Sequence, residues 1–184
     1  MKKRSSKKAL ISVCTLIAVL LVLIIWTIWG NTALMVSTVT VSSNRIPAAF
    51  NGFRIAQVSD LHNAVFGENN AELLQILSEC KPNIIVVTGD LVDAEHTDID
   101  VALDFAKEAA QIAGTYYVTG NHEGSLSQYD ELKTGLESMG VVVLEDASMQ
   151  LEYNGEKVTL IGLSDPSFTL KGNMDRLQLT GQIF

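Results

Sequence analysis

The chain has 184 residues, enough for one domain and an appendage. Its formal net charge of −8 comes from 13 basic and 21 acidic residues, and five of the basic residues precede position 9. The remainder therefore sets eight basic residues against 21 acidic ones, which argues against a nucleic-acid-binding surface. The same excess is unfavourable for an anionic substrate unless bound cations reverse the local field.

The N-terminal region combines a basic tail, residues 1–8, with an uncharged apolar segment, residues 9–29. A helix needs about 20 apolar residues to cross a bilayer. Trp26 and Trp29 lie at the far end of the segment, where indole rings favour the membrane interface. We predict a single-pass signal anchor in the cell membrane, with the basic tail in the cytoplasm and the residues after Gly30 outside.

Two other interpretations of the apolar segment fit less well. A cleavable signal peptide has an apolar region of about 7–15 residues and a small-x-small cleavage site. This segment is longer and ends in Trp-Thr-Ile-Trp-Gly-Asn. A buried helix of a soluble protein would have a polar face. Cys14 lies within the segment and Cys80 far beyond it, so the chain has no disulfide framework.

Residues 30–49 form a connector to the domain. Valines alternate with Ser and Thr around positions 36–41, which favours an extended segment with β-character. Pro47 and Asn51-Gly52 then mark a turn. Residues 53–59 alternate in polarity and stop at Asp60, as expected of a strand that enters a loop.

The middle of the chain alternates between predicted helices and strands. Asn69 or Asn70 can cap the first helix, and Asp98 or Asp100 can cap the second. We predict helices over 69–80, from 98 or 100 to 113 and over 127–139, strands over 84–88, 115–119 and 141–144, and a hairpin over 149–153 and 157–162. The remainder to residue 184 is weakly patterned. This order predicts an α/β fold with a parallel sheet and right-handed crossovers.

Short polar segments follow three of the predicted strands, at the end of the sheet where an open α/β fold places its active site. Their candidate functional residues are Asp60, His62, Asp90, Asn121 and His122. Carboxylate and amide oxygens together with imidazole nitrogens suit Mn²⁺, Fe or Zn²⁺. Each segment alone fits an ordinary turn, but all three in this order indicate a metal site.

The roles of two residues in these segments stay open at this point. Asp93 lies three residues after Asp90 and is either a solvated acid or a residue that orients a ligand. His122 is able to donate a proton or to stabilise charge on a phosphoryl oxygen.

The three segments resemble the first three blocks of the calcineurin-like metallophosphoesterases. The matching stretches are Asp60-Leu61-His62, Gly89-Asp90-Leu91-Val92-Asp93 and Gly120-Asn121-His122-Glu123. The basic tail and anchor resemble the bacterial membrane-associated branch of that family. The resemblance covers about residues 50–165 and implies the first, incomplete part of a four-layer αββα sandwich. The chain then divides into tail 1–8, anchor 9–29, connector 30–49 and partial phosphoesterase domain 50–184.

The resemblance also implies a role for each site residue. Asp60 and His62 would bind the first of two divalent ions, Asp90 would bridge both, and Asn121 would bind the second. His122 would not be a ligand but would assist the leaving group or the transition state. Two ions about 3.5–4 Å apart clamp a phosphate for in-line attack. The implied substrate is a phosphomonoester, phosphodiester or pyrophosphate, and the membrane anchor is compatible with a lipid-linked phosphate.

The histidines depart from the family pattern. The family continues with a further His and a Gly-His-x-His block, whereas this chain has three His in all, and His96 matches no family position. We expect the chain to be the N-terminal portion of a longer enzyme. We also expect weak metal binding, little or no activity, and an exposed apolar sheet face.

Two further function classes compete with an enzyme. A non-catalytic, membrane-tethered binding or scaffold protein is favoured by the missing histidines and opposed by the retained site residues. A nucleotide-binding α/β domain is disfavoured, since the sequence has no G-x-G-x-x-G or G-x-x-x-x-G-K-[ST] phosphate loop.

Overall fold

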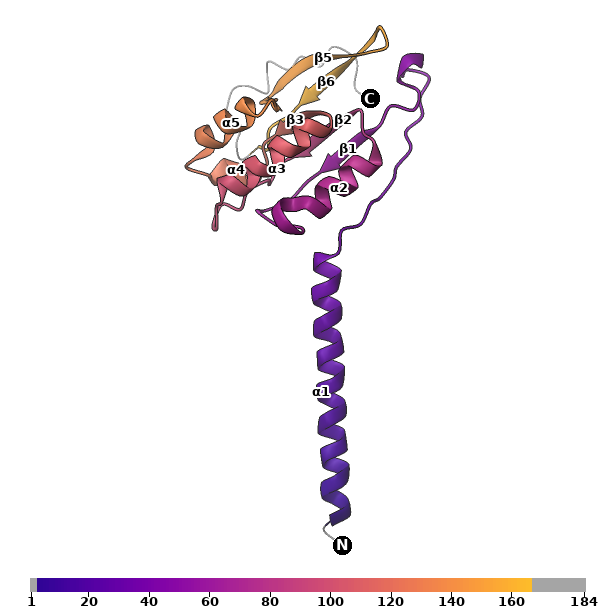
Figure 1. The fold of residues 1–184 in the computed structure, drawn as a ribbon, viewed down its shortest axis with the longest axis vertical. Coiled ribbons are helices and arrows are strands. Elements are labelled where there is room, and N and C mark those ends of the chain that lie inside the picture. The colour runs from indigo at the N-terminus through magenta and orange to yellow at the C-terminus, as the bar shows by residue number, and fades with distance from the viewer. Residues whose placement is uncertain (1–2, 167–184) are drawn as a thin grey trace. The chain divides into compact units, whose positions relative to one another are not determined.

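The computed structural model describes residues 3–166, in two compact units divided between Thr38 and Val39 (Figure 1). The first unit consists of helix α1 (Lys3–Thr32) and the extended residues that follow it. Within α1, Leu10–Thr27 is long and apolar enough to cross a membrane, and none of it is buried. The predicted apolar helix is therefore confirmed as a helix, and it is longer than residues 9–29 at both ends.

Two threonine side chains of this apolar stretch form hydrogen bonds inside the helix. The hydroxyl of Thr15 donates to the carbonyl of Ile11 at 3.0 Å, and that of Thr27 donates to Leu23 at 2.8 Å. Hydrocarbon offers no hydrogen-bond partner, so internal satisfaction of this kind is what a membrane-spanning helix requires.

The second unit is built on the predicted parallel sheet. Its strands are β1 (Ile55–Val58), β2 (Ile84–Thr88), β3 (Gly114–Val118) and β4 (Val142–Val143), in the spatial order β1-β2-β3-β4. All three strand pairs are parallel. Because the order in space is the order in sequence, the carboxyl ends of successive strands lie side by side.

Three helices occupy the crossovers between these strands: α2 (Ala71–Cys80), α3 (Ile99–Ile112) and α5 (Tyr129–Ser138). Right-handed crossovers between consecutive parallel strands place all of them on one face of the sheet. Figure 1 shows α2, α3 and α5 side by side, and α3 contacts both of its neighbours. Their buried faces carry the apolar core residues Leu73, Leu77, Phe105, Ala109, Leu132 and Leu136.

The two faces of the parallel sheet differ in burial. Val58, Val87 and Tyr117 are aligned across three strands and are at most 7% exposed. On the alternate positions, Ile55 is 58% and Val142 is 39% exposed, as expected for a partly uncovered face.

A separate antiparallel hairpin, β5 (Ala147–Tyr153) and β6 (Glu156–Gly162), forms the second sheet. The end of β6 packs closely against β3, because a Cβ atom added at Gly162 would lie 2.8 Å from the Cγ1 of Val118. Phe50, Phe53 and Tyr153 pack their rings at centroid distances of 4.9–5.6 Å and join the hairpin to the chain that leads into β1.

Several details add to or differ from the predictions. The connector, predicted as an extended segment with β-character, is not paired into a strand among the described residues 33–54, and the regular element there is the 3₁₀ helix η1 (Ala48–Phe50). Asn70 is the last residue of the 3₁₀ turn η2 (Glu68–Asn70) and directly precedes α2. Contrary to the prediction, its side chain does not cap α2 but accepts from the amide of Phe66. A short helix, α4 (Asn121–Ser125), was not predicted at all. The weakly patterned segment after residue 166 lies outside the described residues.

Candidate metal centre

The site is built from the three loops that leave β1, β2 and β3. The backbone of the first loop lies along the second, with amides of Asp60, His62 and Asn63 donating to the carbonyls of Gly89, Asp90 and Leu91 at 2.9–3.2 Å. These hydrogen bonds extend the contact between the two strands beyond the sheet. The fold therefore brings together segments that are about thirty residues apart in sequence.

The loops adopt an unusual backbone conformation. Asp60, His62, Asn63 and Asp90 all have positive φ angles, between 46° and 61°. Non-glycine residues rarely occupy this left-handed region, and each occurrence costs free energy that the surrounding structure must supply. Such residues cluster at functional sites, which agrees with the placement of the predicted ligands here.

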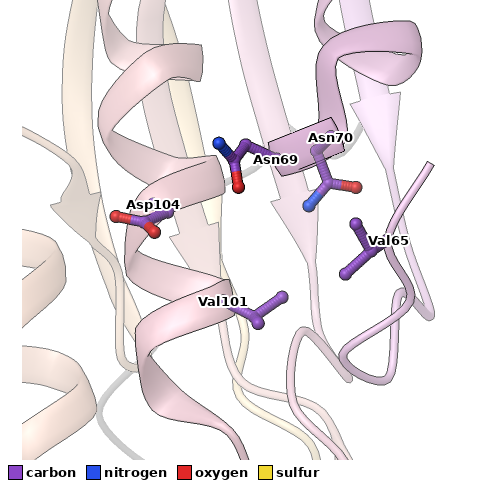
Figure 2. A pocket seen from close by; sticks show the side chains of 5 residues that line it. All are labelled: Val65, Asn69, Asn70, Val101 and Asp104. Atoms are coloured by element: carbon purple, nitrogen blue, oxygen red, sulfur yellow. The ribbon is translucent and has the colours of Figure 1, made fainter. Parts of the chain in front are cut away.

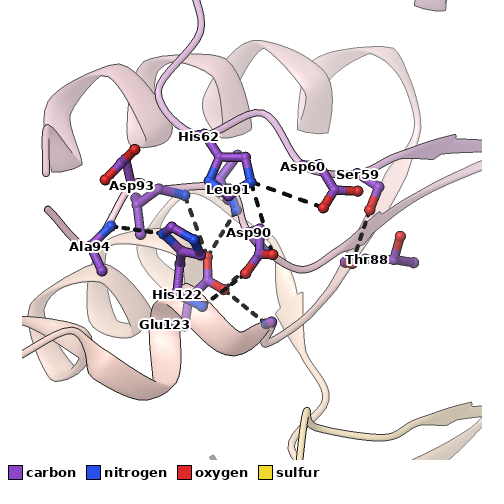
Figure 3. A network of polar contacts seen from close by, with 12 residues as sticks. Ser59, Asp60, His62, Thr88, Asp90, Leu91, Asp93, Ala94, His122 and Glu123 are labelled. Carbon is purple, nitrogen blue, oxygen red and sulfur yellow. Dashed lines mark hydrogen bonds and ion pairs between the residues drawn. The ribbon is translucent and has the colours of Figure 1, made fainter. Parts of the chain in front are cut away.

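Asp60, His62 and Asp90 form one group of potential ligands (Figure 3). One donor atom from each lies within 4.8 Å of the others. The Nε2 atom of His62 is 4.0 Å from a carboxylate oxygen of Asp60 and 4.0 Å from one of Asp90. The Asp60 side chain is 68% exposed and that of Asp90 12%, so the group opens to solvent on one side. Two carboxylates and one imidazole fit a divalent transition metal.

His122 lies next to this group and is oriented by backbone. Its ring packs edge to face on that of His62, with centroids 4.4 Å apart. Its Nδ1 atom accepts a hydrogen bond from the amide of Ala94 at 3.1 Å, and its own amide donates to Oδ1 of Asp90 at 2.9 Å. Because Nδ1 is an acceptor, the proton of the neutral imidazole resides on Nε2.

Asp93 forms a second possible group with the same two histidines, His62 and His122, again within 4.8 Å. One of its oxygens is already engaged by the amides of His96 and Glu95, and these hydrogen bonds hold the pKa of Asp93 below its ordinary value. Asp93 is therefore half-buried with one carboxylate oxygen bonded to backbone, and its role as a solvated acid or as a residue that orients a ligand stays a prediction.

Two further polar residues considered in the sequence, Asn121 and His96, are not members of either group of potential ligands in the described part of the chain. Asn121 is exposed and is the first residue of α4, next to His122. His96 is exposed as well.

Sequence reasoning missed two residues that organise the site. Glu123 is 1% exposed, and its carboxylate accepts hydrogen bonds from four backbone amides in the loops after β2 and β3. The side chain of Asn63 accepts from the amide of Asp93 and donates to the carbonyl of Asp98, each at 2.6 Å. Both residues directly follow a motif histidine in the sequence, which is the only feature that could have drawn attention to them. Their hydrogen-bond partners depend on the fold and cannot be read from the sequence.

A small pocket lies away from this site, between η2 and α3 (Figure 2). It is lined by Val65, Asn69, Asn70, Val101 and Asp104. None of the predicted ligands lines this pocket, so the candidate metal site remains the group at the strand ends.

The sequence matches a known family over most of this domain. Calcineurin-like phosphoesterases match residues 53–178. A Bos taurus protein called "transmembrane protein with metallophosphoesterase domain" is 29% identical over 122 residues, which are 65% of this chain and 28% of that protein. The metallophosphoesterase YkoQ of Bacillus subtilis, itself uncharacterised, is 28% identical over 136 residues, 72% of this chain and 50% of that protein. The chain belongs to the calcineurin-like phosphoesterase family, which confirms the resemblance drawn from its three polar segments.

One solved structure is also similar. Phosphopantetheinyl hydrolase from Mycobacterium tuberculosis aligns over 59% of this chain and 41% of its own, with 21% identity and a TM-score of 0.44. This chain spans between 28% and 50% of the length of the two relatives above.

Proposed function

We propose that the protein is a membrane-anchored, metal-dependent phosphoesterase with Asp60, His62, Asp90 and Asn121 as metal ligands and His122 as the catalytic residue. The observation that carries the proposal is the convergence of Asp60, His62 and Asp90 to within 4.8 Å at the ends of two neighbouring strands. Family membership supports phosphoester hydrolysis in general.

The ligand set supports two divalent ions, such as Mn, Fe or Zn. Asp90 would hold both ions, and its carboxylate is already oriented, with one oxygen 4.0 Å from Nε2 of His62 and the other accepting from the His122 amide. The loop of Asn121 adds a neutral oxygen ligand for the second ion. Bound metal would supply positive charge for a phosphate group in an otherwise acidic domain.

His122 is suited to hydrogen-bond donation. Its Nδ1 atom accepts from the Ala94 amide, so Nε2 carries the proton of the neutral ring. An Nε2–H group in this fixed tautomer would donate a hydrogen bond to a phosphoryl or leaving-group oxygen and stabilise the negative charge that develops there.

The anchor defines where the reaction takes place. The domain boundaries that we propose are tail 1–8, anchor 9–29, connector 30–49 and phosphoesterase domain 50–184, with the domain outside the cytoplasm. A phosphomonoester, phosphodiester or pyrophosphate is the substrate class, and a lipid-linked phosphate at the membrane surface fits the anchor.

A non-catalytic binding protein is the second candidate. The low number of histidines favours it, because three are few for two metal shells and His96 is exposed and apart from the others. Under either candidate, we expect this chain alone to bind metal weakly.

The deciding experiment measures Mn²⁺-dependent hydrolysis of p-nitrophenyl phosphate by the chain in detergent. Asp90→Asn should lower the rate by more than the roughly 10–100-fold typical of outer-sphere changes, because it removes a direct ligand. Asp130→Asn, on the exposed side of α5, should leave the rate unchanged. A measurable wild-type rate at saturating Mn²⁺ that Asp90→Asn leaves unchanged would overturn the assigned mechanism. Mn²⁺ binding that Asp90→Asn leaves unchanged would overturn Asp90 as a metal ligand.

A further inference from the structure

Glu123 is a buried carboxylate outside the predicted ligand set. It is 1% exposed, whereas acidic side chains are almost never fully buried unless they are paired. Its partners are four backbone amides rather than a basic side chain: Asp90 and Gly120 donate to Oε2 at 2.9 and 2.8 Å, and Leu91 and Val92 donate to Oε1 at 2.8 and 3.4 Å. These bonds satisfy the carboxylate in place of water.

The four amides come from both strand-end loops of the site. Those of Asp90, Leu91 and Val92 belong to the loop after β2, and that of Gly120 belongs to the turn after β3. Asp90 returns a bond, since its own carboxylate accepts from the amide of His122. The two loops are therefore bonded in both directions, through Glu123 and through Asp90 (Figure 3).

Glu123 bonds to a loop whose backbone conformation is unfavourable on its own. Asp90 has a φ of 50° and Gly89 a φ of 85°, so this loop depends on external bonds to keep its left-handed turn. That turn sets the direction of the Asp90 carboxylate toward His62. The same bonds fix the start of α4, which carries His122.

Only a carboxylate fits these partners. All four are donors, and a carboxylate offers acceptor positions on both oxygens, whereas a glutamine amide would place an NH₂ group against two N–H groups. The Tyr117 hydroxyl lies beside the carboxylate, and burial, together with the negative charge of Glu123, raises the pKa of the Tyr117 hydroxyl, which stays protonated.

We propose that Glu123 is a positioning residue that presets Asp90 and His122 for metal binding. The proposal rests on the metal site proposed above. It assigns Glu123 no contact with metal or substrate: it acts only through the backbone of the two loops.

The experiment compares Glu123→Gln with Glu145→Gln in the full chain in detergent. Glu145 is a suitable control, because it is a half-buried carboxylate that is bonded to two side chains, Tyr129 and Lys133, and not to the backbone of the site loops. The first measurement is Mn²⁺ affinity by calorimetry. Glu123→Gln should weaken it by about 10–100-fold, as losses of groups that orient ligands do, and Glu145→Gln should leave it unchanged.

The second measurement separates positioning from general destabilisation. In Glu123→Gln, amide hydrogen exchange at Asp90, Leu91 and Gly120 should accelerate far more than exchange at the core amides of β2. In Glu145→Gln, these loop amides should exchange as in wild type. If Glu123→Gln does not fold, Glu123→Asp, which keeps the charge and shortens the side chain, takes its place and should show the same pattern at smaller size.

The outcomes distinguish this proposal from the function on which it rests. Unchanged loop exchange in Glu123→Gln, or unchanged Mn²⁺ affinity, overturns the positioning role. A wild type that binds no Mn²⁺ overturns the metal site and, with it, the functional part of the role. Faster loop exchange in that case would show only that Glu123 holds the loops together.

Discussion

Gly89 and Gly120 mark the point where the two inner loops of the site approach most closely. A Cβ atom at Gly89 would lie 2.6 Å from the Cα of Gly120, closer than such atoms are found. A Cβ atom at Gly120 would meet the Oδ1 of Asp90 and lie 2.6 Å from its amide nitrogen. The absence of these two side chains lets the Asp90 carboxylate occupy its place.

Gly120→Ala tests this close approach without straining the backbone dihedral angles of residue 120 itself. Gly120 has a φ of −102°, which alanine adopts freely, so the effect comes from the added methyl group alone. We expect the Asp90 carboxylate to be displaced, with a loss of about 1–3 kcal/mol in the free energy of unfolding. Mn²⁺ affinity, measured by calorimetry, should fall by about tenfold or more.

Gly114→Ala is the matched control, since a Cβ atom there would meet its nearest neighbours at 3.8 Å, an ordinary contact. It should leave both the free energy of unfolding and the Mn²⁺ affinity close to wild type. If Gly120→Ala behaves in the same way, the loops are more adaptable than the glycine contacts indicate.

At the level of single residues, the sequence predicts the candidate metal ligands better than it predicts the residues that hold their loops in place. Asp60, His62 and Asp90 could be singled out because ligand-type residues at strand ends have a recognisable spacing. Glu123 and Asn63 could not, because their partners are backbone groups of loops about thirty residues away, and backbone amides look alike in any sequence. The partners of a buried polar group become visible only when the fold brings the loops together.

Among the elements, α3 has the clearest start. Asp98 precedes its first residue in an extended conformation and accepts a hydrogen bond from the amide of Val101 at 3.3 Å. The carbonyl of Asp98 also receives the side chain of Asn63, so the start of α3 is tied to the loop after β1. The cap therefore connects the helix to the site.

Asp98→Ala should lower the free energy of unfolding by about 1 kcal/mol more than Asp100→Ala, as measured by urea denaturation. Both substitutions remove a negative charge near the helix N-terminus, so their difference isolates the capping bond. Equal losses would mean that the Val101 amide finds water as readily as the Asp98 carboxylate.

Element boundaries show where local patterns are insufficient. Asp98 was a correct cap prediction because its own helix supplies the partner, the amide of Val101. Asn70 was a wrong one, because its side-chain oxygen accepts from Phe66 in the preceding loop while its backbone adopts a φ of 61°. The short helix α4 could not be anticipated either: five residues have little propensity of their own, and the Glu123 bonds hold this turn in place.

For the molecule as a whole, the parallel sheet could be predicted from the order of strands and helices, and the family from the three polar segments. The valine-rich connector, predicted as extended with β-character, pairs with no strand in the described residues, since alternation alone provides no partner strand. The second sheet is the two-stranded hairpin predicted over 149–153 and 157–162.

The anchor prediction is tested in membranes. The 20.0 kDa chain, expressed in a bacterium, should stay in the membrane fraction after alkaline carbonate extraction, and deletion of residues 1–29 should release it. Protease added to intact spheroplasts should digest the domain. A protein shortened by about 30 residues would instead indicate signal-peptide cleavage, and a domain protected until lysis would reverse the proposed orientation.

The consecutive order of strands has a consequence for how the site acquires its metal. Under the proposed orientation, the chain is exported unfolded from its anchor onward, and its ligands emerge at positions 60–62, 90 and 121–122 in turn. Asp60, His62 and Asp90 converge only after β2 has paired with β1, when residue 90 is already outside. A site that does not exist in the unfolded chain cannot carry an ion through export. The metal in the site would then be chosen by what the extracellular surroundings supply, and not by the metal pools of the cytoplasm.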